Sequence, residues 1–126
     1  MGRHEFAYAL YPHAGGWREA RVAAEARRFN APLRWVDGIG ETPFAVVDDP
    51  NLVLDTIKRG DRSDVVVLRF YEAHGGRGVA HVRLAQPAGR ARRADALEEA
   101  TGDLALDDGV LVVPYRPHEV ITVLVG

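Results

Sequence analysis

The sequence contains no cysteine, which excludes disulfide bonds and thiolate metal sites. It also lacks an apolar run near the roughly 20 residues that a membrane-spanning helix needs, so we expect no membrane partner. Neither sign of charge dominates, because 16 basic and 18 acidic residues leave a formal net charge of −2. Nothing in this balance favours nucleic acid as a partner.

What remains is the composition of an ordinary globular protein, with 47% hydrophobic and 27% charged residues. The 126 residues suit one domain, which we expect to span positions 1–126. No signal peptide is recognisable, so the expected location is the cytoplasm. An alternating pattern begins almost at Met1, which indicates a segment of a longer polypeptide.

Short alternating segments separated by Pro and Gly turns predict an all-β fold, an antiparallel β-sandwich with one short α-helix near the N-terminus. The helix is expected at 17–30, where Ala, Glu and Arg are frequent and Pro and Gly are absent. The expected strands are 5–11, 33–36, 44–47, 52–58, 64–73, 79–84, 91–97, 103–106, 109–115 and 118–125.

Segments 64–73 and 79–84 are predicted to form a hairpin around a glycine-rich loop at 74–78. A five-residue loop places Val66, Leu68 and Phe70 on one face with the apolar side chains Ala80, Val82 and Leu84. A two-residue turn would instead mix apolar and charged side chains on that face, so the first register is favoured. It leaves Arg69, Tyr71, His81 and Arg83 outside.

No residue set predicts catalysis or metal binding by this chain. The five histidines lack the spacing of a helical zinc site. The adjacent carboxylates fall where turns are expected, which favours solvated loops; they are Asp48/Asp49, Glu98/Glu99 and Asp107/Asp108. The glycine-rich loop is not followed by a helix, which argues against a nucleotide site. The basic run at 90–93 is interpreted as a solvated strand edge.

One cluster is more informative, because Glu72, His74 and Arg77 gather at the tip of the predicted hairpin. Such a group can hydrogen-bond sugar hydroxyls or hold a neighbouring domain. The alternative is a Glu72–Arg77 ion pair that is satisfied locally.

Four ordered stretches resemble the C-terminal β region of family 38 glycoside hydrolases, the α-mannosidases. They are 4–15 with 30–33, then 51–58, then 67–75, then 116–120. The third ends in Tyr71-Glu72-Ala73-His74-Gly75, which is most similar to the cytosolic and bacterial branch. The resemblance covers essentially the whole chain.

The resemblance implies a retaining glycosidase whose two carboxyl groups and divalent metal, zinc or cobalt, lie in N-terminal catalytic domains that this chain lacks. It therefore implies no catalytic residue, metal ligand or cofactor in this chain. The implied partners are those catalytic domains of the same polypeptide and the α-mannoside substrate. Glu72, His74 and Arg77 are then candidates for the edge of the substrate site or for a domain interface.

Three functions remain open at this point. The favoured one is a structural and interface domain that is inactive alone. A carbohydrate-binding module with weak affinity for mannosides is the alternative, which exposed flat aromatic side chains would favour. A small independent enzyme is least favoured, because the sequence shows no nucleophile and base pair.

Overall fold

The computed structural model describes residues 2–31, 42–61 and 64–126. The chain divides into two units, Met1–Gly38 and Ile39–Gly126, and each is treated by itself. The second unit carries the β-structure, and the first carries the helix α1, Val22–Asn30. That one domain spans residues 1–126 remains a prediction.

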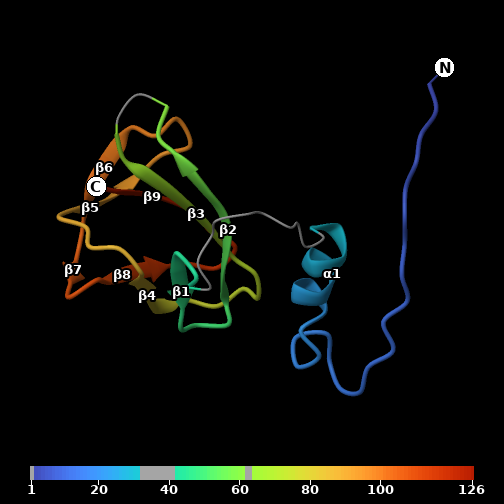
Figure 1. Ribbon diagram of the computed structural model, residues 1–126. Helices are drawn as coiled ribbons and strands as arrows, with labels where there is room; N and C mark the ends of the chain where they lie inside the picture. Colours follow the sequence, from blue (N-terminus) through green and yellow to red (C-terminus); the bar gives the residue numbers. More distant parts are fainter. Residues whose placement is uncertain (1, 32–41, 62–63) are drawn as a thin grey trace. The chain divides into compact units, whose positions relative to one another are not determined.

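The second unit is an antiparallel β-sandwich, which confirms the predicted fold class (Figure 1). One sheet has the strand order β1-β4-β8-β7, and the other has the order β2-β3-β9-β5-β6. Strand bounds are β1 Ala45–Val47, β2 Leu52–Arg59, β3 Val66–Glu72, β4 Gly78–Leu84, β5 Ala91–Ala94, β6 Ala100–Leu104, β7 Leu106–Asp107, β8 Val110–Tyr115 and β9 Val120–Val125.

The core lies between the two sheets and is built from the alternate residues of their inner faces. Leu68 and Phe70 of β3 face Val82 of β4 and Leu111 of β8, and all four are fully buried. Burying a side chain of this size contributes roughly 1.5–3 kcal/mol. The long-range pairing of these strands therefore has a continuous apolar core to stabilise it.

The predicted hairpin between 64–73 and 79–84 is wrong. Strand β3 pairs with β2 and β9, whereas β4 pairs with β1 and β8 in the opposite sheet. The predicted grouping of faces is nevertheless right, because the apolar sides of both strands meet in the core. Two strands can bring their apolar sides together edge to edge or across a core, and alternation does not distinguish these arrangements.

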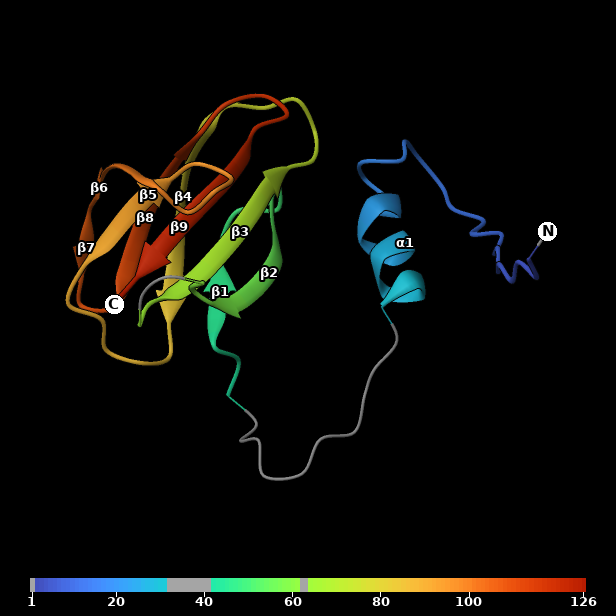
Figure 2. The ribbon, with the colours of Figure 1, turned by 90° about the horizontal axis from the view of Figure 1, so that it is seen from above.

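Residues 73–77 are thus a connection that crosses from one sheet to the other. Residues 48–51 between β1 and β2, and residues 116–119 between β8 and β9, also cross between the sheets. We call the end of the sandwich where these three connections meet the crossover end. Figure 2 shows the yellow-green connection after β3 beside the red one before β9. A backbone hydrogen bond from Ala73 N to Asn51 O links 73–77 to 48–51.

Two further expectations need correction in the sandwich. The strand expected at 91–97 ends at Ala94, because the Asp95 carboxylate accepts the N–H groups of Leu97 and Glu99 and forms a turn. The basic run at 90–93 is not a strand edge, since β5 lies between β9 and β6. Two of its three arginines are paired within the domain, Arg90 with Asp103 at 2.7 Å and Arg93 with Glu119 at 2.8 Å.

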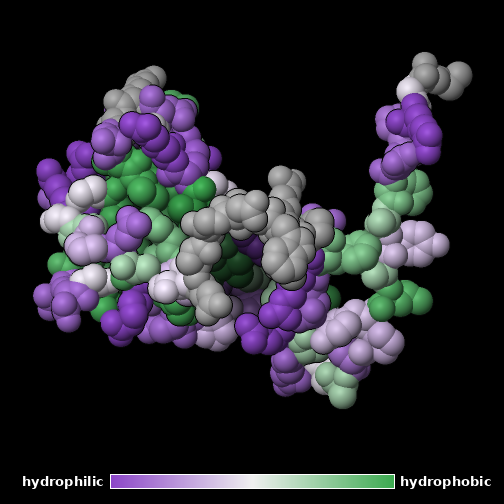
Figure 3. Space-filling model, in the orientation of Figure 1, coloured by the Kyte–Doolittle hydropathy of each residue, from purple (hydrophilic) through white to green (hydrophobic). Residues whose placement is uncertain are grey.

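The first unit departs most from expectation. Residues 5–11 form no strand, and Phe6, Tyr8 and Leu10 are 86%, 84% and 92% exposed. Figure 3 shows hydrophobic side chains, in green, standing out along this N-terminal segment. The helix begins at Val22 instead of 17, after turns and a left-handed Arg21 with φ 53°. The expected strand 33–36 lies outside the described residues.

Candidate functional site

The candidate site is the crossover end, and its centre is Glu72, the last residue of β3. The alternation of β3 places Glu72 on the same face as Leu68 and Phe70, so its side chain continues the core. The side chain has no exposed surface. A buried carboxylate is costly unless every oxygen is paired, so its partners decide what Glu72 can do.

Four backbone N–H groups donate to the Glu72 carboxylate. Those of His74 and Gly76 reach Oε1 at 2.8 and 2.9 Å, and those of Gly75 and His118 reach Oε2 at 2.7 and 2.8 Å. Three of the donors belong to the connection 73–77, and the fourth belongs to 116–119. One carboxylate therefore fixes two of the three crossing connections to each other.

These bonds also settle the protonation state of Glu72. Burial alone raises the pKa of a carboxyl group, but the four donors outweigh burial and lower the pKa of Glu72 from its ordinary 4.5 to about 2. A general acid needs a pKa near the working pH. Glu72 is ionised throughout the neutral range and has no proton to give.

A second set of hydrogen bonds ties in the connection 48–51. His74 Nδ1 lies 3.0 Å from Asn51 Oδ1, and Asn51 Nδ2 donates to the Tyr115 hydroxyl at 3.3 Å. Tyr115 in turn donates to Asp49 Oδ2 at 2.6 Å, which raises the pKa of the tyrosine hydroxyl. Asp49 Oδ1 also accepts the backbone N–H of Asn51 at 2.9 Å. All three connections are therefore joined by polar contacts.

The predicted cluster is brought together only in part. Glu72 and His74 share the hydrogen-bonded centre, while Arg77 is exposed and makes no ion pair with Glu72. Glu72 is satisfied by the main chain, so the locally paired alternative does not hold. Arg77 instead lines a shallow pocket together with Gly78, Tyr115, Arg116 and Pro117.

Sequence reasoning missed His118, Asn51, Asp49 and Tyr115 as members of this centre. His118 has a left-handed backbone with φ 56°, which turns its N–H toward Glu72. Its ring lies against Gly75, where an added Cβ would be 3.1 Å from Nε2. The Asp49-Pro50-Asn51 turn was visible in the sequence, but nothing there indicated that it meets residue 115.

The adjacent carboxylates singled out in the sequence differ in their surroundings. Asp48 accepts the His81 backbone N–H at 2.7 Å, and Asp107 and Asp108 are exposed as expected. Glu98 departs from the expected solvated loop, because its side chain is 12% exposed and contacts Lys58 Nζ at 2.7 Å. Within residues 2–31, 42–61 and 64–126, no group of three or more His, Asp or Glu side chains is placed to hold a metal ion.

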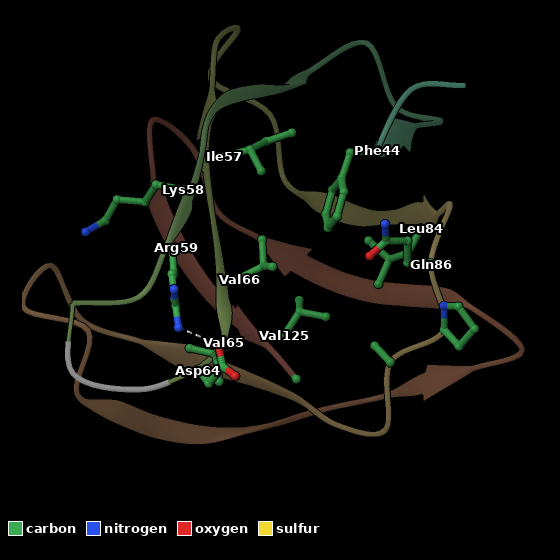
Figure 4. Close-up of a pocket in the computed structure, with 13 residues that line it drawn as sticks. Phe44, Ile57, Lys58, Arg59, Asp64, Val65, Val66, Leu84, Gln86 and Val125 are labelled. Carbon is green, nitrogen blue, oxygen red and sulfur yellow. Dashed lines mark hydrogen bonds and ion pairs between the residues drawn. The ribbon is translucent and has the colours of Figure 1, made fainter. Parts of the chain in front are cut away.

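The opposite end of the sandwich opens into an apolar pocket (Figure 4). Phe44, Val66, Leu84 and Val125 line it, and the Arg59–Asp64 ion pair, 3.0 Å long, stands at its rim. Val66 and Leu84 occupy the ends of β3 and β4 that are distant from Glu72 and Gly78. Its lining offers no convergent set of groups for acid–base or nucleophilic chemistry.

Comparison with known proteins identifies the family. Residues 51–123 match the family described as "Glycosyl hydrolases family 38 C-terminal beta sandwich domain". The chain belongs to this family. The matched region contains the strands β2 to β8 and both partners of the Glu72–His118 bond. The resemblance seen in the sequence is thereby confirmed.

The relatives agree with this assignment. Alpha-mannosidase 2C1 of Mus musculus is 38% identical over 98% of this chain, and its Homo sapiens counterpart is 35% identical over 98%. Alpha-mannosidase G of Dictyostelium discoideum is 32% identical over 60% of the chain. The chain spans 13% of the length of each of the first two relatives. In the part of the chain that the structure describes, no helix is long and apolar enough to cross a membrane.

Proposed function

We propose that this chain is the C-terminal structural and interface domain of a retaining α-mannosidase that hydrolyses terminal α-mannosidic linkages, and that it has no catalytic activity alone. Family membership and the names of the relatives support the enzyme class. The two carboxyl groups of the reaction, and its zinc or cobalt ion, would then lie in the preceding domains. The proposed location stays the cytoplasm.

The observation that carries the proposal is the bonding of Glu72. This is the one carboxylate of the predicted cluster, and both of its oxygens are occupied by backbone N–H groups. A nucleophile or a proton donor needs an oxygen that can reach a substrate. The arrangement is that of a group that holds loops in place.

In the proposed enzyme, Glu72 is a positioning residue. It fixes the connections 73–77 and 116–119, and these carry the imidazoles of His74 and His118 and the guanidinium of Arg77. Such groups can donate hydrogen bonds to sugar hydroxyls or to the preceding domains. We propose that the crossover end lies at the edge of the substrate site or at a domain interface.

The sugar-binding alternative is not favoured by the surface of the sandwich. Sugar-binding modules present exposed aromatic rings on which sugar faces stack. Across residues 42–61 and 64–126, the large exposed hydrophobic side chains are aliphatic, and Tyr115 at the crossover end is buried.

The test compares this chain with a longer polypeptide that includes the preceding domains, using an aryl α-mannoside as substrate. We expect hydrolysis by the longer polypeptide and none by this chain. Titration of the chain with methyl α-mannoside should leave the NMR shifts of 74–78 unchanged at millimolar ligand. Hydrolysis by the chain alone would contradict the structural role, and shifts confined to 74–78 would favour the sugar-binding module.

A further inference from the structure

Residues 2–31, the described part of the N-terminal unit, include a helix but no buried residue. Its residues 2–13 are extended and form no strand, and none of the nine residues of α1 is buried. A helix of nine residues is too short to be stable in water without packing. The helix α1 therefore needs packing contacts from another part of a polypeptide to be stable.

The extended segment is patterned for burial. Phe6, Tyr8 and Leu10 alternate, so they would share one side of a strand, and each is more than four-fifths exposed. Of the three, Tyr8 and Leu10 line a shallow groove beside α1, which Val22 and Phe29 also line. Phe29 itself is 47% exposed. The contacts inside the unit leave most of this apolar surface uncovered.

An extended segment of this kind is completed by a sheet edge. Its free N–H and C=O groups pair with an open strand, while alternate side chains enter the apolar face of that sheet. The helix, whose Val22, Ala26 and Phe29 fall at helical spacing, needs an apolar cover in addition. The missing partner is thus a β-sheet with one open edge and an apolar face.

The comparisons show that this chain corresponds to a small part of longer relatives. The family match begins at residue 51, so the N-terminal unit is outside the part that defines the C-terminal sandwich. The relatives nevertheless match 98% of this chain, and the chain is only 13% of their length. Because the matched family is a C-terminal domain, the additional polypeptide of the relatives precedes it.

We propose that residues 5–11 add as a strand to an open sheet edge in the preceding part of the same polypeptide, and that α1 packs beside them. The inference rests on the proposed function only in taking this chain as part of a longer α-mannosidase. The N-terminal unit is then the last element of the preceding domain, and the sandwich follows it as a separate module.

Hydrogen exchange measured by mass spectrometry tests the proposal on this chain and on the longer polypeptide. We expect the amides of 5–11 to exchange without protection in this chain and at least about 100-fold more slowly in the longer one. Equal, fast exchange in both would overturn the proposal. Protection already present in this chain would also overturn the proposal. Size-exclusion chromatography with light scattering would then show whether the segment pairs within one copy of the chain or between two copies.

A pair of matched variants of the longer polypeptide distinguishes a paired, half-buried strand from general ordering. The triple variant Phe6→Ser, Tyr8→Ser, Leu10→Ser should lose the protection of 5–11. The control, Glu5→Ser, changes an exposed polar residue of the same segment that does not line the groove beside α1, and it should keep the protection. Retained protection in the first variant would contradict the burial of that side.

The readouts keep the two proposals apart. Hydrolysis of the aryl α-mannoside tests the proposed function, and exchange at 5–11 tests the docking. An active longer polypeptide with an unprotected segment overturns the docking alone. A longer polypeptide that is inactive although 5–11 is protected contradicts the α-mannosidase assignment and leaves the docking in place.

Discussion

Strand β3 and the segment 5–11 carry the same kind of pattern, and the structure treats them differently. Phe70 of β3 is fully buried, whereas Phe6 is 86% exposed. Strand β3 is hydrogen-bonded on both sides, by β2 and β9, while 5–11 pairs with no strand among the described residues. The difference teaches that alternation supplies a face to bury, and that a strand forms only where a neighbour accepts its backbone groups.

The comparison can be tested by truncating the two phenylalanines. Phe70→Ala removes a fully buried ring and should lower the free energy of unfolding by about 4 kcal/mol. Phe6→Ala should change it by less than about 0.5 kcal/mol. Urea denaturation of this chain, followed by circular dichroism, measures both. Similar losses in the two variants would contradict the difference in burial between the two rings.

A second test concerns the polar centre of the sandwich. In Glu72→Gln one carboxylate oxygen becomes an NH₂ group, which faces two backbone donors and leaves them unpaired. We expect a loss of about 2–3 kcal/mol at neutral pH, measured by urea denaturation. Asp107→Asn removes the same charge from an exposed position at the end of β7 and should change little.

The same variant checks the pKa of Glu72. Because the folded pKa is about 2 and the ordinary value is 4.5, the unfolded chain binds the proton first as the pH falls. The stabilisation is complete above about pH 5 and declines toward pH 2, by up to roughly 3 kcal/mol. This decline in the free energy of unfolding between about pH 5 and pH 2 should be missing in Glu72→Gln. The same decline in the variant as in the parent chain would contradict the low pKa of Glu72.

The smallest expected effect comes from a close contact at the crossover end. A Cβ at Gly78 would lie 2.7 Å from the Tyr115 hydroxyl, and that ring is buried and anchored on Asp49. Gly78→Ala should therefore cost about 2 kcal/mol. At Gly102 nothing lies within 4 Å of an added Cβ, so Gly102→Ala should be within about 0.5 kcal/mol of the parent. Thermal melts of the two variants make the comparison.

Much of the fold follows from local patterns in the sequence. Strand positions such as 52–58 and the inward faces of 66–70 and 80–84 were predicted, because alternation and turn residues are local signals. The pairing of β3 with β9 was not, because these strands are far apart in the chain and nothing local selects the partner. For the same reason the hairpin prediction chose the wrong neighbour for β3.

The candidate site was likewise predicted only where its residues are close together in the sequence. Glu72 and His74 were selected because they are close in the sequence and polar at a glycine-rich loop. The part played by His118 depends on a left-handed backbone and on a second crossing connection, and neither has a sequence signal as simple as alternation. Arg77 belongs to the same loop, but its side chain is exposed and makes no ion pair with Glu72.

The bond between His118 and Glu72 joins residues 46 positions apart. We expect it to form after β3 and β9 have paired, because closing so long a loop costs entropy before the contact contributes. Contacts of this type are made late on the folding route. We therefore expect Glu72 to slow unfolding. Its loss should raise the unfolding rate, and so shorten the lifetime of the folded domain, more than it lowers the folding rate.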